Sequence, residues 1–416
     1  MIIYMLFLKK TWIVLLTIFF LFSNLCIFAT DAQYVWSNSV ETSSTTSNSV
    51  SSTIAEQNSG NFLNIESGGA ILMEQSTGKI LYEHNIHEKL RPASVTKIMS
   101  ILLIMEALDS GKITLDDQVP CSENASSMGG SQIWLNETEQ LTVHEMLKAI
   151  CVVSANDCTV AMAEFLAGTQ EAFVMQMNAR AKELGMNDTI FKNCHGIDED
   201  GHVTSPYDIA LMSRELMMNH PKITEYTTIW MDSLRDGKSE LVNTNKLIRN
   251  YTGATGLKTG STSVALYNLS ATATRNNLSL IAVVMKAPST KVRFAEAQKL
   301  LDYGFNNYEY KEFAKKGDVV GNIIVNKGTF SSVDVIFDQN AGFLLKKGES
   351  QNVTQSIDLF NEITAPVQEG QKLGEAIYSN NGEIYAVNLI AKTSVDSLGF
   401  FNVAKMVYYN WFNLLR

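Results

Sequence analysis

Three short motifs in this chain combine residue types that can carry out acyl transfer. They follow one another along the sequence as Ser94-x-x-Lys97, Ser154-x-Asn156 and Lys258-Thr259-Gly260. A serine hydroxyl becomes a good nucleophile only when a neighbouring base accepts its proton, and a neutral lysine amine can be that base. The first motif therefore predicts a serine nucleophile with a lysine base.

Each motif alone is common by chance, so its setting decides its meaning. A second Ser-x-x-Lys runs from Ser76 to Lys79 between two short apolar segments, where Gly78 favours the turn of a β-hairpin. Further copies of Ser-x-Asn begin at Ser59 and Ser379. Only the copy at 154–156 lies between two apolar helical segments. Burying polar side chains there costs free energy, so their presence indicates a functional role.

The residues after Pro92 predict the helix that carries the first motif. The run SVTKIMSILLIMEAL is apolar on nearly every side, which is typical of a buried central helix. Residues i and i+3 share a helix face, so Ser94 and Lys97 are expected to meet near the helix start. A polar first turn with a snorkelling lysine is the alternative that this motif alone leaves open.

The remaining pattern predicts several domains. The motif at Lys258 opens the first of two alternating strands joined at residues 275–277, and a helix follows. Short strand-like runs then predict a small all-β domain. The expected parts are a signal peptide at 1–32, a Ser/Thr/Asn-rich tether at 33–61, a catalytic domain at 62–307, the β-rich domain at 308–392 and an amphipathic helix at 393–416.

The two ends of the chain predict its location. Lys9 and Lys10 precede an apolar run that ends in small residues near Ala32, as in a secretory signal peptide; an uncleaved anchor is the competing interpretation. Residues 393–416 place polar side chains on one helical face and aromatic and aliphatic ones elsewhere, which predicts a helix at a membrane interface. Docking on the β-rich domain or on a second copy is the alternative. We expect the protein at the outer face of the cytoplasmic membrane.

Composition narrows the class of protein. Hydrophobic residues make up 45% of the chain, which predicts a folded core. The formal charge of −10 argues against nucleic acid as a partner. His195 and His202 flank acidic residues in HGIDEDGH, but no His-Glu-x-x-His is present, so we interpret the segment as a solvated turn and predict no metal or cofactor. The cysteines after the first 32 residues are expected to be buried free thiols.

In this order the three motifs resemble those of penicillin-binding proteins and serine β-lactamases. The blocks RPASVTKIMSILLIMEAL, MGGSQIWL, NCHGIDEDGH and GATGLKTGST further resemble the low-molecular-mass D-alanyl-D-alanine carboxypeptidases, the type-5 penicillin-binding proteins. The resemblance spans about residues 65–305. It implies an α/β (α+β) transpeptidase fold, with an antiparallel sheet flanked by helices and a helical lobe. Departures are Ala155 in place of a common Gly, Ser261 in place of Tyr, Phe or His, and Cys194 in place of Pro.

The resemblance also implies roles for particular residues. The catalytic set is expected to be Ser94, Lys97, Ser154 and Asn156, and the substrate-binding set Lys258, Thr259, Gly260, Ser261 and Thr262. The backbone N–H groups of Ser94 and Ser261 are expected to form the oxyanion hole. The substrates implied are peptidoglycan stem peptides that end in D-Ala-D-Ala, and β-lactams are implied as covalent inhibitors.

Three other functions use the same fold. A β-lactamase of class A needs a deacylating glutamate in a Glu-x-x-Leu-Asn pattern, which this sequence lacks. A DD-endopeptidase would use the same catalytic groups on a cross-linked substrate. A non-catalytic cell-wall-binding protein would have no reason to keep three buried polar groups.

Overall fold

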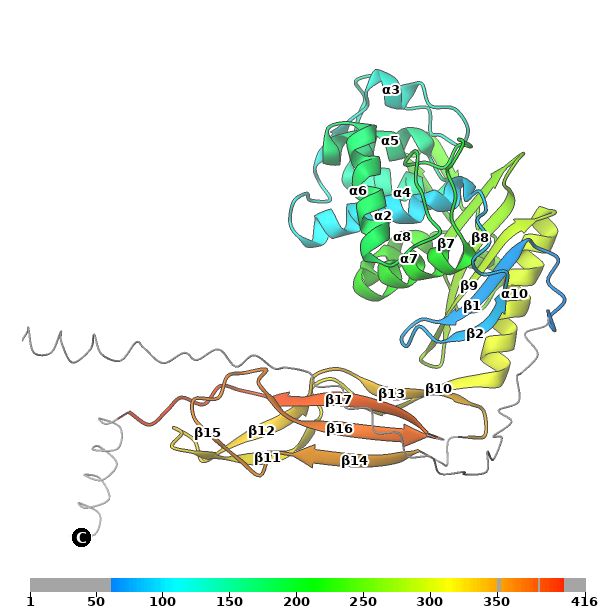
Figure 1. Ribbon diagram of the computed structural model, residues 1–416. Helices are drawn as coiled ribbons and strands as arrows, with labels where there is room; N and C mark the ends of the chain where they lie inside the picture. Colours follow the sequence, from blue (N-terminus) through cyan, green and yellow to red (C-terminus); the bar gives the residue numbers. More distant parts are fainter. Residues whose placement is uncertain (1–60, 350–352, 381, 400–416) are drawn as a thin grey trace, which may run out of the picture. The chain divides into compact units, whose positions relative to one another are not determined.

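The computed structural model describes residues 61–349, 353–380 and 382–399. The predicted signal peptide, nearly all of the predicted tether and residues 400–416 of the predicted terminal helix lie outside these ranges. Figure 1 shows a first domain of helices and strands and a second domain of strands, and each is described by itself below. Within the described ranges, no helix combines the length and apolar character needed to cross a membrane.

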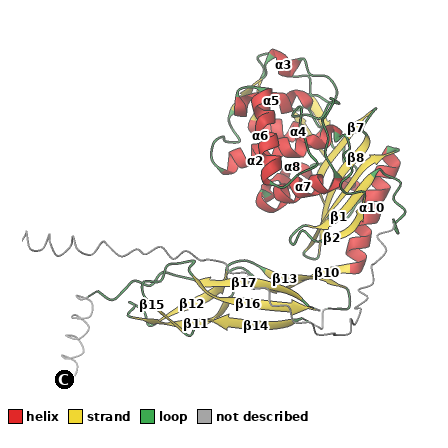
Figure 2. Cartoon of the chain, in the orientation of Figure 1, coloured by secondary structure: helices red, strands yellow, loops and turns green. Residues whose placement is uncertain are grey.

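The first domain is built on a five-stranded antiparallel sheet. Its strands, in spatial order, are β2 (Ile80–His84), β1 (Gly69–Glu74), β9 (Leu278–Ala287), β8 (Leu266–Arg275) and β7 (Ala254–Thr262). The centres of β8 and β9 are buried on both faces because helices cover the sheet from two sides (Figure 2). Strand β7 lies at an edge of the sheet, so its outer backbone groups are free to pair with another chain.

One helix covers one face of the sheet, and a helical lobe lies against the other. Helix α10 (Thr290–Asn307) packs on β9 and β8, whereas α7 packs on β9 and β1. The lobe comprises the 3₁₀ turn η1 (Ala93–Thr96) and α2 (Lys97–Asp109), α3 (Glu123–Ser126), α4 (Val143–Val152), α5 (Asn156–Ala167), α6 (Gln170–Glu183), α7 (Pro206–Asn219), η2 (Pro221–Ile223), α8 (Thr224–Thr227) and α9 (Leu247–Asn250). Two small hairpins join them, β3 (Gln118–Pro120) with β4 (Gln140–Thr142) and β5 (Met231–Leu234) with β6 (Ser239–Val242).

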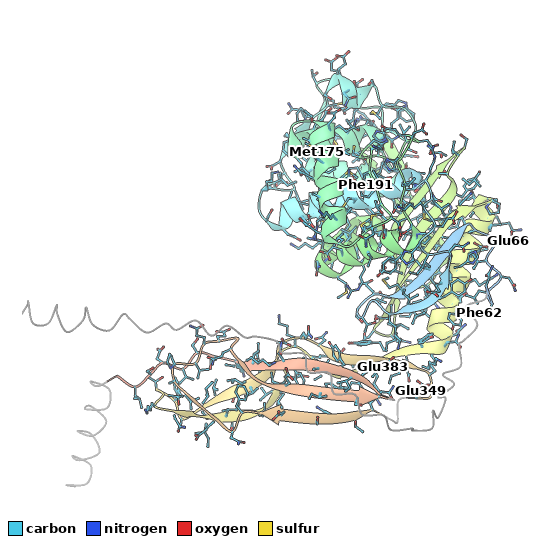
Figure 3. The ribbon with its side chains drawn as sticks, in the orientation of Figure 1. Phe62, Glu66, Met175, Phe191, Glu349 and Glu383 are labelled. Atoms are coloured by element: carbon cyan, nitrogen blue, oxygen red, sulfur yellow. The ribbon has the colours of Figure 1, made fainter. Side chains whose placement is uncertain are left out.

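Helix α2 is the buried central helix that the sequence predicts. Its residues Ile98 and Leu102 are fully buried, and the helix packs against α5, α6 and α7. The regular helix begins at Lys97 rather than Ser94, because Ala93–Thr96 forms a tighter 3₁₀ turn. Figure 3 places Phe191 among these helices and Met175 on the outer side of α6. The cysteines at 121, 151, 158 and 194 are buried and unbonded, as predicted.

The second domain is all β, as predicted. It contains the two-stranded sheet of β10 (Tyr308–Ala314) and β13 (Ala341–Lys346). Its six-stranded sheet runs in the order β14 (Thr354–Leu359), β16 (Lys372–Asn380), β17 (Glu383–Ala391), β12 (Ser332–Phe337), β11 (Val319–Asn326) and β15 (Glu362–Thr364). All of its strand pairs are antiparallel except β11 with β15.

The predicted start of the terminal helix at residue 393 is wrong. Val395 pairs with Val367, and Ser397 pairs with Gly328 in isolated β-bridges. Val395 is only 2% exposed and belongs to the core of the second domain. Residues 393–399 therefore belong to the β domain: two of them form β-bridges with it, and the side chain of Val395 packs in its core.

Candidate active site

The nucleophile turn holds Ser94 between two segments that approach it closely. Ala93 has a φ of +49°, a strained conformation for a residue with a side chain. A Cβ on Gly260 of β7 would lie 2.8 Å from the backbone nitrogen of Ser94, and a Cβ on Gly196 would lie 1.9 Å from the carbonyl oxygen of Ala93. Glycine at both positions therefore allows strand β7 and the 194–197 segment to clamp the turn.

The side chain of Lys97 brings the first two motifs together. Lys97 is fully buried, and its Nζ donates to Asn156 Oδ1 at 2.6 Å and to the carbonyl oxygen of His195 at 2.7 Å. The same nitrogen lies 3.1 Å from Ser94 Oγ. This is hydrogen-bond distance, so a neutral amine there can accept the serine proton.

The surroundings of Lys97 favour its neutral form. Burial is the main cause that lowers the pKa of Lys97 well below its usual value, and the positive charge of Lys258 lowers it further. Cys194 and Asp157 act in the opposite direction and do not reverse the shift. The site therefore supplies a base where the nucleophile needs one.

Ser154 and Asn156 lie at the junction of α4 and α5, as the sequence predicts. Ser154 has a φ of +67° and is 3% exposed, and within the described ranges its Oγ has no hydrogen-bond partner. An unpaired buried hydroxyl costs about 1–3 kcal/mol, so its retention indicates a group reserved for substrate or proton transfer. Asn156 Nδ2 donates to the carbonyl oxygen of Gly129 at 2.7 Å, which fixes the amide that faces Lys97.

Lys258 and Thr259 lie in β7, across the site from Ser154. Lys258 is 1% exposed, and burial is the main cause that lowers its pKa to about 7, with Arg293 contributing. Its Nζ donates to the carbonyl oxygen of Thr259 at 3.0 Å. Thr259 Oγ1 donates to Thr244 Oγ1 at 2.7 Å. The cation therefore has few partners of its own and can hold a substrate carboxylate.

The last residues of β7 present a backbone edge. Ser261 is exposed and pairs with Tyr267 of β8 on its inner side only. Thr262 Oγ1 accepts from the backbone N–H of Ala265 at 2.9 Å, which closes the turn after the strand. An extended substrate can therefore add to the outer edge of β7 at these residues.

Sequence reasoning missed two residues that shape the site from other elements. Arg293 of α10 is 6% exposed, and its Nη1 lies 3.2 Å from the carbonyl oxygens of both Gly260 and Asn268. Asn268 of β8 is fully buried, and its Nδ2 donates to the carbonyl oxygens of Arg91 at 2.8 Å and Pro92 at 2.9 Å. A polar residue inside an apolar strand was the available signal for Asn268.

The prediction that HGIDEDGH is a solvated turn is wrong for its two histidines. His195 is 5% exposed and His202 is 2% exposed. Burial lowers the pKa of His195 to about 3 and that of His202 to about 4, so both are neutral at neutral pH. The segment supports the nucleophile turn: the carbonyl oxygen of His195 accepts from Lys97, and His202 Nε2 lies 2.8 Å from Thr96 Oγ1. In the part of the chain that the structure describes, no three metal-ligating side chains gather at one point.

Two family models match this chain. The model described as D-alanyl-D-alanine carboxypeptidase matches residues 52–289. The model described as the C-terminal domain of penicillin-binding protein 5 matches residues 308–397. Together they match both domains except helix α10 (Thr290–Asn307), and the second match ends at Ser397, which forms a β-bridge with Gly328.

Curated relatives and solved structures agree with the family models. D-alanyl-D-alanine carboxypeptidase DacF of Bacillus subtilis (strain 168) is 45% identical over 351 residues, which cover 83% of this chain and 90% of the relative. Penicillin-binding protein 5 of Haemophilus influenzae is 31% identical with a TM-score of 0.67, covering 80% of this chain and 98% of that structure. Penicillin-binding protein D2 of Listeria monocytogenes, in the ampicillin-bound form, is 30% identical with a TM-score of 0.54, covering 58% and 99%.

Replacing Gly196 with alanine tests the clamp on the nucleophile turn. Gly196 has a φ of +94° and no room for a Cβ beside Ala93, whereas Gly201 has a φ of +80° and a Cβ there would meet only the flexible end of Lys192 at 3.3 Å. Both alanines share the cost of left-handed backbone, so their difference isolates the clash. We expect Gly196→Ala to lose about 1–3 kcal/mol more unfolding free energy than Gly201→Ala, measured by chemical denaturation. Equal losses would show that the turn is not clamped.

Proposed function

Because the chain belongs to the D-alanyl-D-alanine carboxypeptidase family, we propose that it removes the terminal D-alanine from peptidoglycan stem peptides through an acyl-enzyme on Ser94. The observation that carries this assignment is the buried amine of Lys97, whose Nζ lies 3.1 Å from Ser94 Oγ and whose pKa is held low by burial. A nucleophile and a neutral base at this distance are the parts that acyl transfer requires.

Substrate binding uses the outer edge of β7. Lys258 attracts the terminal carboxylate of the substrate, and the hydroxyls of Thr259 and Thr262 assist. The backbone of Gly260 and Ser261 pairs with the substrate in extended form. This places the scissile carbonyl beside the nucleophile turn, where the N–H groups of Ser94 and Ser261 stabilise the oxyanion.

Acylation then moves a proton from Ser94, through Lys97 and Ser154, to the departing amine. Lys97 accepts the proton of Ser94 as its Oγ attacks the carbonyl carbon between the two D-alanines. Ser154, whose hydroxyl is free of protein partners within the described ranges, relays the proton from Lys97 to the departing amine. The C–N bond breaks, D-alanine leaves, and the acyl group remains on Ser94 Oγ. Asn156 holds Lys97 and the substrate amide throughout.

Hydrolysis of the acyl-enzyme uses the same base in reverse. A water enters from the position vacated by D-alanine, and neutral Lys97 accepts its proton as the water attacks the ester carbonyl. The serine oxygen leaves with a proton returned by Lys97. The products are the shortened stem peptide and the free enzyme, so the cycle needs no metal or cofactor.

The same geometry supports inhibition by β-lactams. These compounds mimic the terminal D-alanyl-D-alanine, so attack by Ser94 opens their ring and leaves an ester that water reaches slowly. Penicillin-binding protein D2 of Listeria monocytogenes has been solved in an ampicillin-bound form and in a cefotaxime-bound form, which supports this part of the proposal.

The proposed location follows from the two ends of the chain. The N-terminal run after Lys9 and Lys10 has the composition of a signal peptide, and residues 400–416 retain the amphipathic pattern of an interfacial helix. We place the protein outside the cytoplasm, at the outer face of the membrane, where its substrate lies. Release of the protein from membranes on deletion of residues 400–416 is the corresponding test.

Release of D-alanine tests the proposed activity. The purified protein is incubated with a diacyl-peptide that ends in D-Ala-D-Ala, and free D-alanine is measured. We expect Ser94→Ala to abolish release and Ser76→Ala, in the second Ser-x-x-Lys, to leave it unchanged. Ser76 Oγ donates a hydrogen bond to Glu74 Oε1 in the turn between β1 and β2. Its replacement therefore controls for the loss of a serine outside the site. Absence of release from the folded parent would overturn the assignment.

The charge of Lys258 is expected to set the pH dependence of acylation. Lys258 lowers the pKa of Lys97. Removing the charge of Lys258 therefore raises the pKa of Lys97, so that the neutral base forms at higher pH. The rate of acylation by a fluorescent penicillin is measured as a function of pH. In Lys258→Gln we expect the rising limb of this profile to move to higher pH. In Lys258→Arg, which retains the charge, the limb is expected to stay near its parent position. An unmoved limb in Lys258→Gln would contradict the electrostatic coupling.

A further inference from the structure

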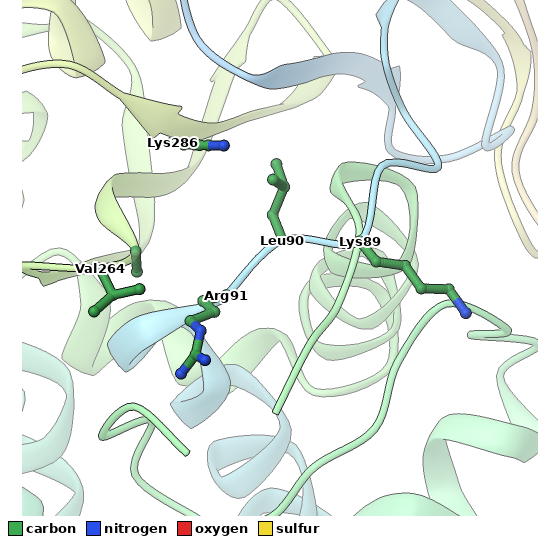
Figure 4. Close-up of a pocket in the computed structure, with 6 residues that line it drawn as sticks. Lys89, Leu90, Arg91, Val264 and Lys286 are labelled. Carbon is green, nitrogen blue, oxygen red and sulfur yellow. The ribbon is translucent and has the colours of Figure 1, made fainter. Parts of the chain in front are cut away.

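A cavity opens beside the segment that leads into the nucleophile turn. Its volume is about 190 Å³. Three cationic and three apolar residues, with no carboxylate among them, line it (Figure 4): Lys89, Leu90, Arg91, Val264, Ala265 and Lys286. Such a lining favours an anionic ligand whose carbon skeleton rests on apolar walls. The catalytic cycle derived above does not use these side chains.

Lys286 occupies a strained position in this cavity. It has a φ of +56° in β9, where the pairing with β8 shifts between Tyr267 and Leu269. Such a bulge re-aims a side chain, and a left-handed non-glycine residue costs on the order of 1–2 kcal/mol. The backbone N–H of Lys286 donates to Asn268 Oδ1 at 2.7 Å. That same Asn268 holds the residues just before Ser94, so the strained lysine is coupled to the nucleophile turn.

The ammonium of Lys286 is the unpaired cation of the cavity. Arg91 Nη2 lies 2.9 Å from Asp200 Oδ1, and Lys89 Nζ lies 4.0 Å from Asp188 Oδ1. Within the described ranges, no carboxylate lies within ion-pair distance of Lys286. Figure 4 shows the side chain of Lys286 reaching toward Leu90, while the ammonium of Lys89 turns away. A ligand carboxylate at this point would meet a cation that no protein group neutralises.

The direction of the bound substrate leads toward this cavity. On the proposed function, Lys258 holds the terminal carboxylate, and the scissile carbonyl lies opposite Ser261. The acyl part of the substrate therefore continues along the edge of β7 toward Thr262 and the turn beyond it. Strand β7 ends at Thr262, and Val264 and Ala265 lie in the turn that follows, so this wall of the cavity stands just beyond the end of the edge that pairs with the substrate.

We propose that Lys286 is a specificity-determining residue that binds a free carboxylate of the stem peptide on the acyl side of the scissile bond, upstream of the residues that pair with β7. The inference rests on the proposed function. The cavity then distinguishes stems that carry a free carboxylate at that position from stems in which it is an amide.

Two matched donors test the proposal. Both end in D-Ala-D-Ala, and they differ only in a carboxylate or a carboxamide at that upstream position. We expect the parent to hydrolyse the carboxylate donor with a kcat/KM about tenfold higher at low salt, as for a charged hydrogen bond. The preference should shrink as ionic strength rises.

Three variants locate the effect at Lys286. Lys286→Gln is expected to reduce the preference to less than about twofold, the level of a weak surface contact, by lowering kcat/KM for the carboxylate donor. Lys286→Arg is expected to retain the preference. Lys182→Gln removes an exposed lysine of α6 and should behave as the parent.

Each other result overturns the inference in a distinguishable way. Hydrolysis of both donors at equal rates, or a preference that survives in Lys286→Gln, removes the proposed role of Lys286 and leaves the carboxypeptidase assignment intact. Failure of the parent to hydrolyse either donor overturns the assignment and this inference with it. Competition by poly(glycerol phosphate) that requires Lys286, without a donor preference, would assign the cavity to a polymer phosphate instead.

Discussion

The structure depends on one buried amine. Lys97 is fully enclosed, and a charged ammonium there would lose its hydration for only a few hydrogen bonds. The protein supplies acceptors from Asn156 and the carbonyl of His195, and it places Lys258 nearby so that the neutral form is favoured. The same enclosure that disfavours the charge leaves the lone pair directed at Ser94. Burial of one side chain thus produces both the geometry and the basicity of the site.

The rest of the first domain holds three elements against that amine. The turn before α2 carries Ser94, the junction of α4 and α5 carries Ser154 and Asn156, and the edge strand β7 carries Lys258 and Thr259. Gly260 lets β7 approach the turn more closely than any side chain would permit, and Gly196 does the same for the 194–197 segment. Strand β7 lies at an edge of the sheet, and most sheets protect such an edge. In the proposed function, this free edge binds the substrate.

The sequence predicts the motifs and their elements because periodicity and local turn chemistry are local properties. It also predicts the buried central helix, the helix junction at Ser154 and the all-β second domain. It misses groups whose role depends on tertiary contact. The carbonyl oxygen of His195 is a backbone group, so the residue type at this position does not reveal its role. Arg293 reaches β7 from helix α10, which is distant in sequence. The sequence of residues 393–399 does not reveal the β-bridges that these residues form. The burial of His202 is equally invisible in a Gly- and Asp-rich run.

The protonation state of Lys97 is the most direct test of this account. Lysine side chains labelled with ¹³C and ¹⁵N can be titrated by NMR, with Lys97→Met used to assign the signal. The account predicts a resonance that titrates well below the usual lysine pKa of about 10.4 and moves to higher pH when Lys258 is replaced by glutamine. A Lys97 signal that stays protonated up to the usual lysine range would contradict the central claim, because no base would then face Ser94.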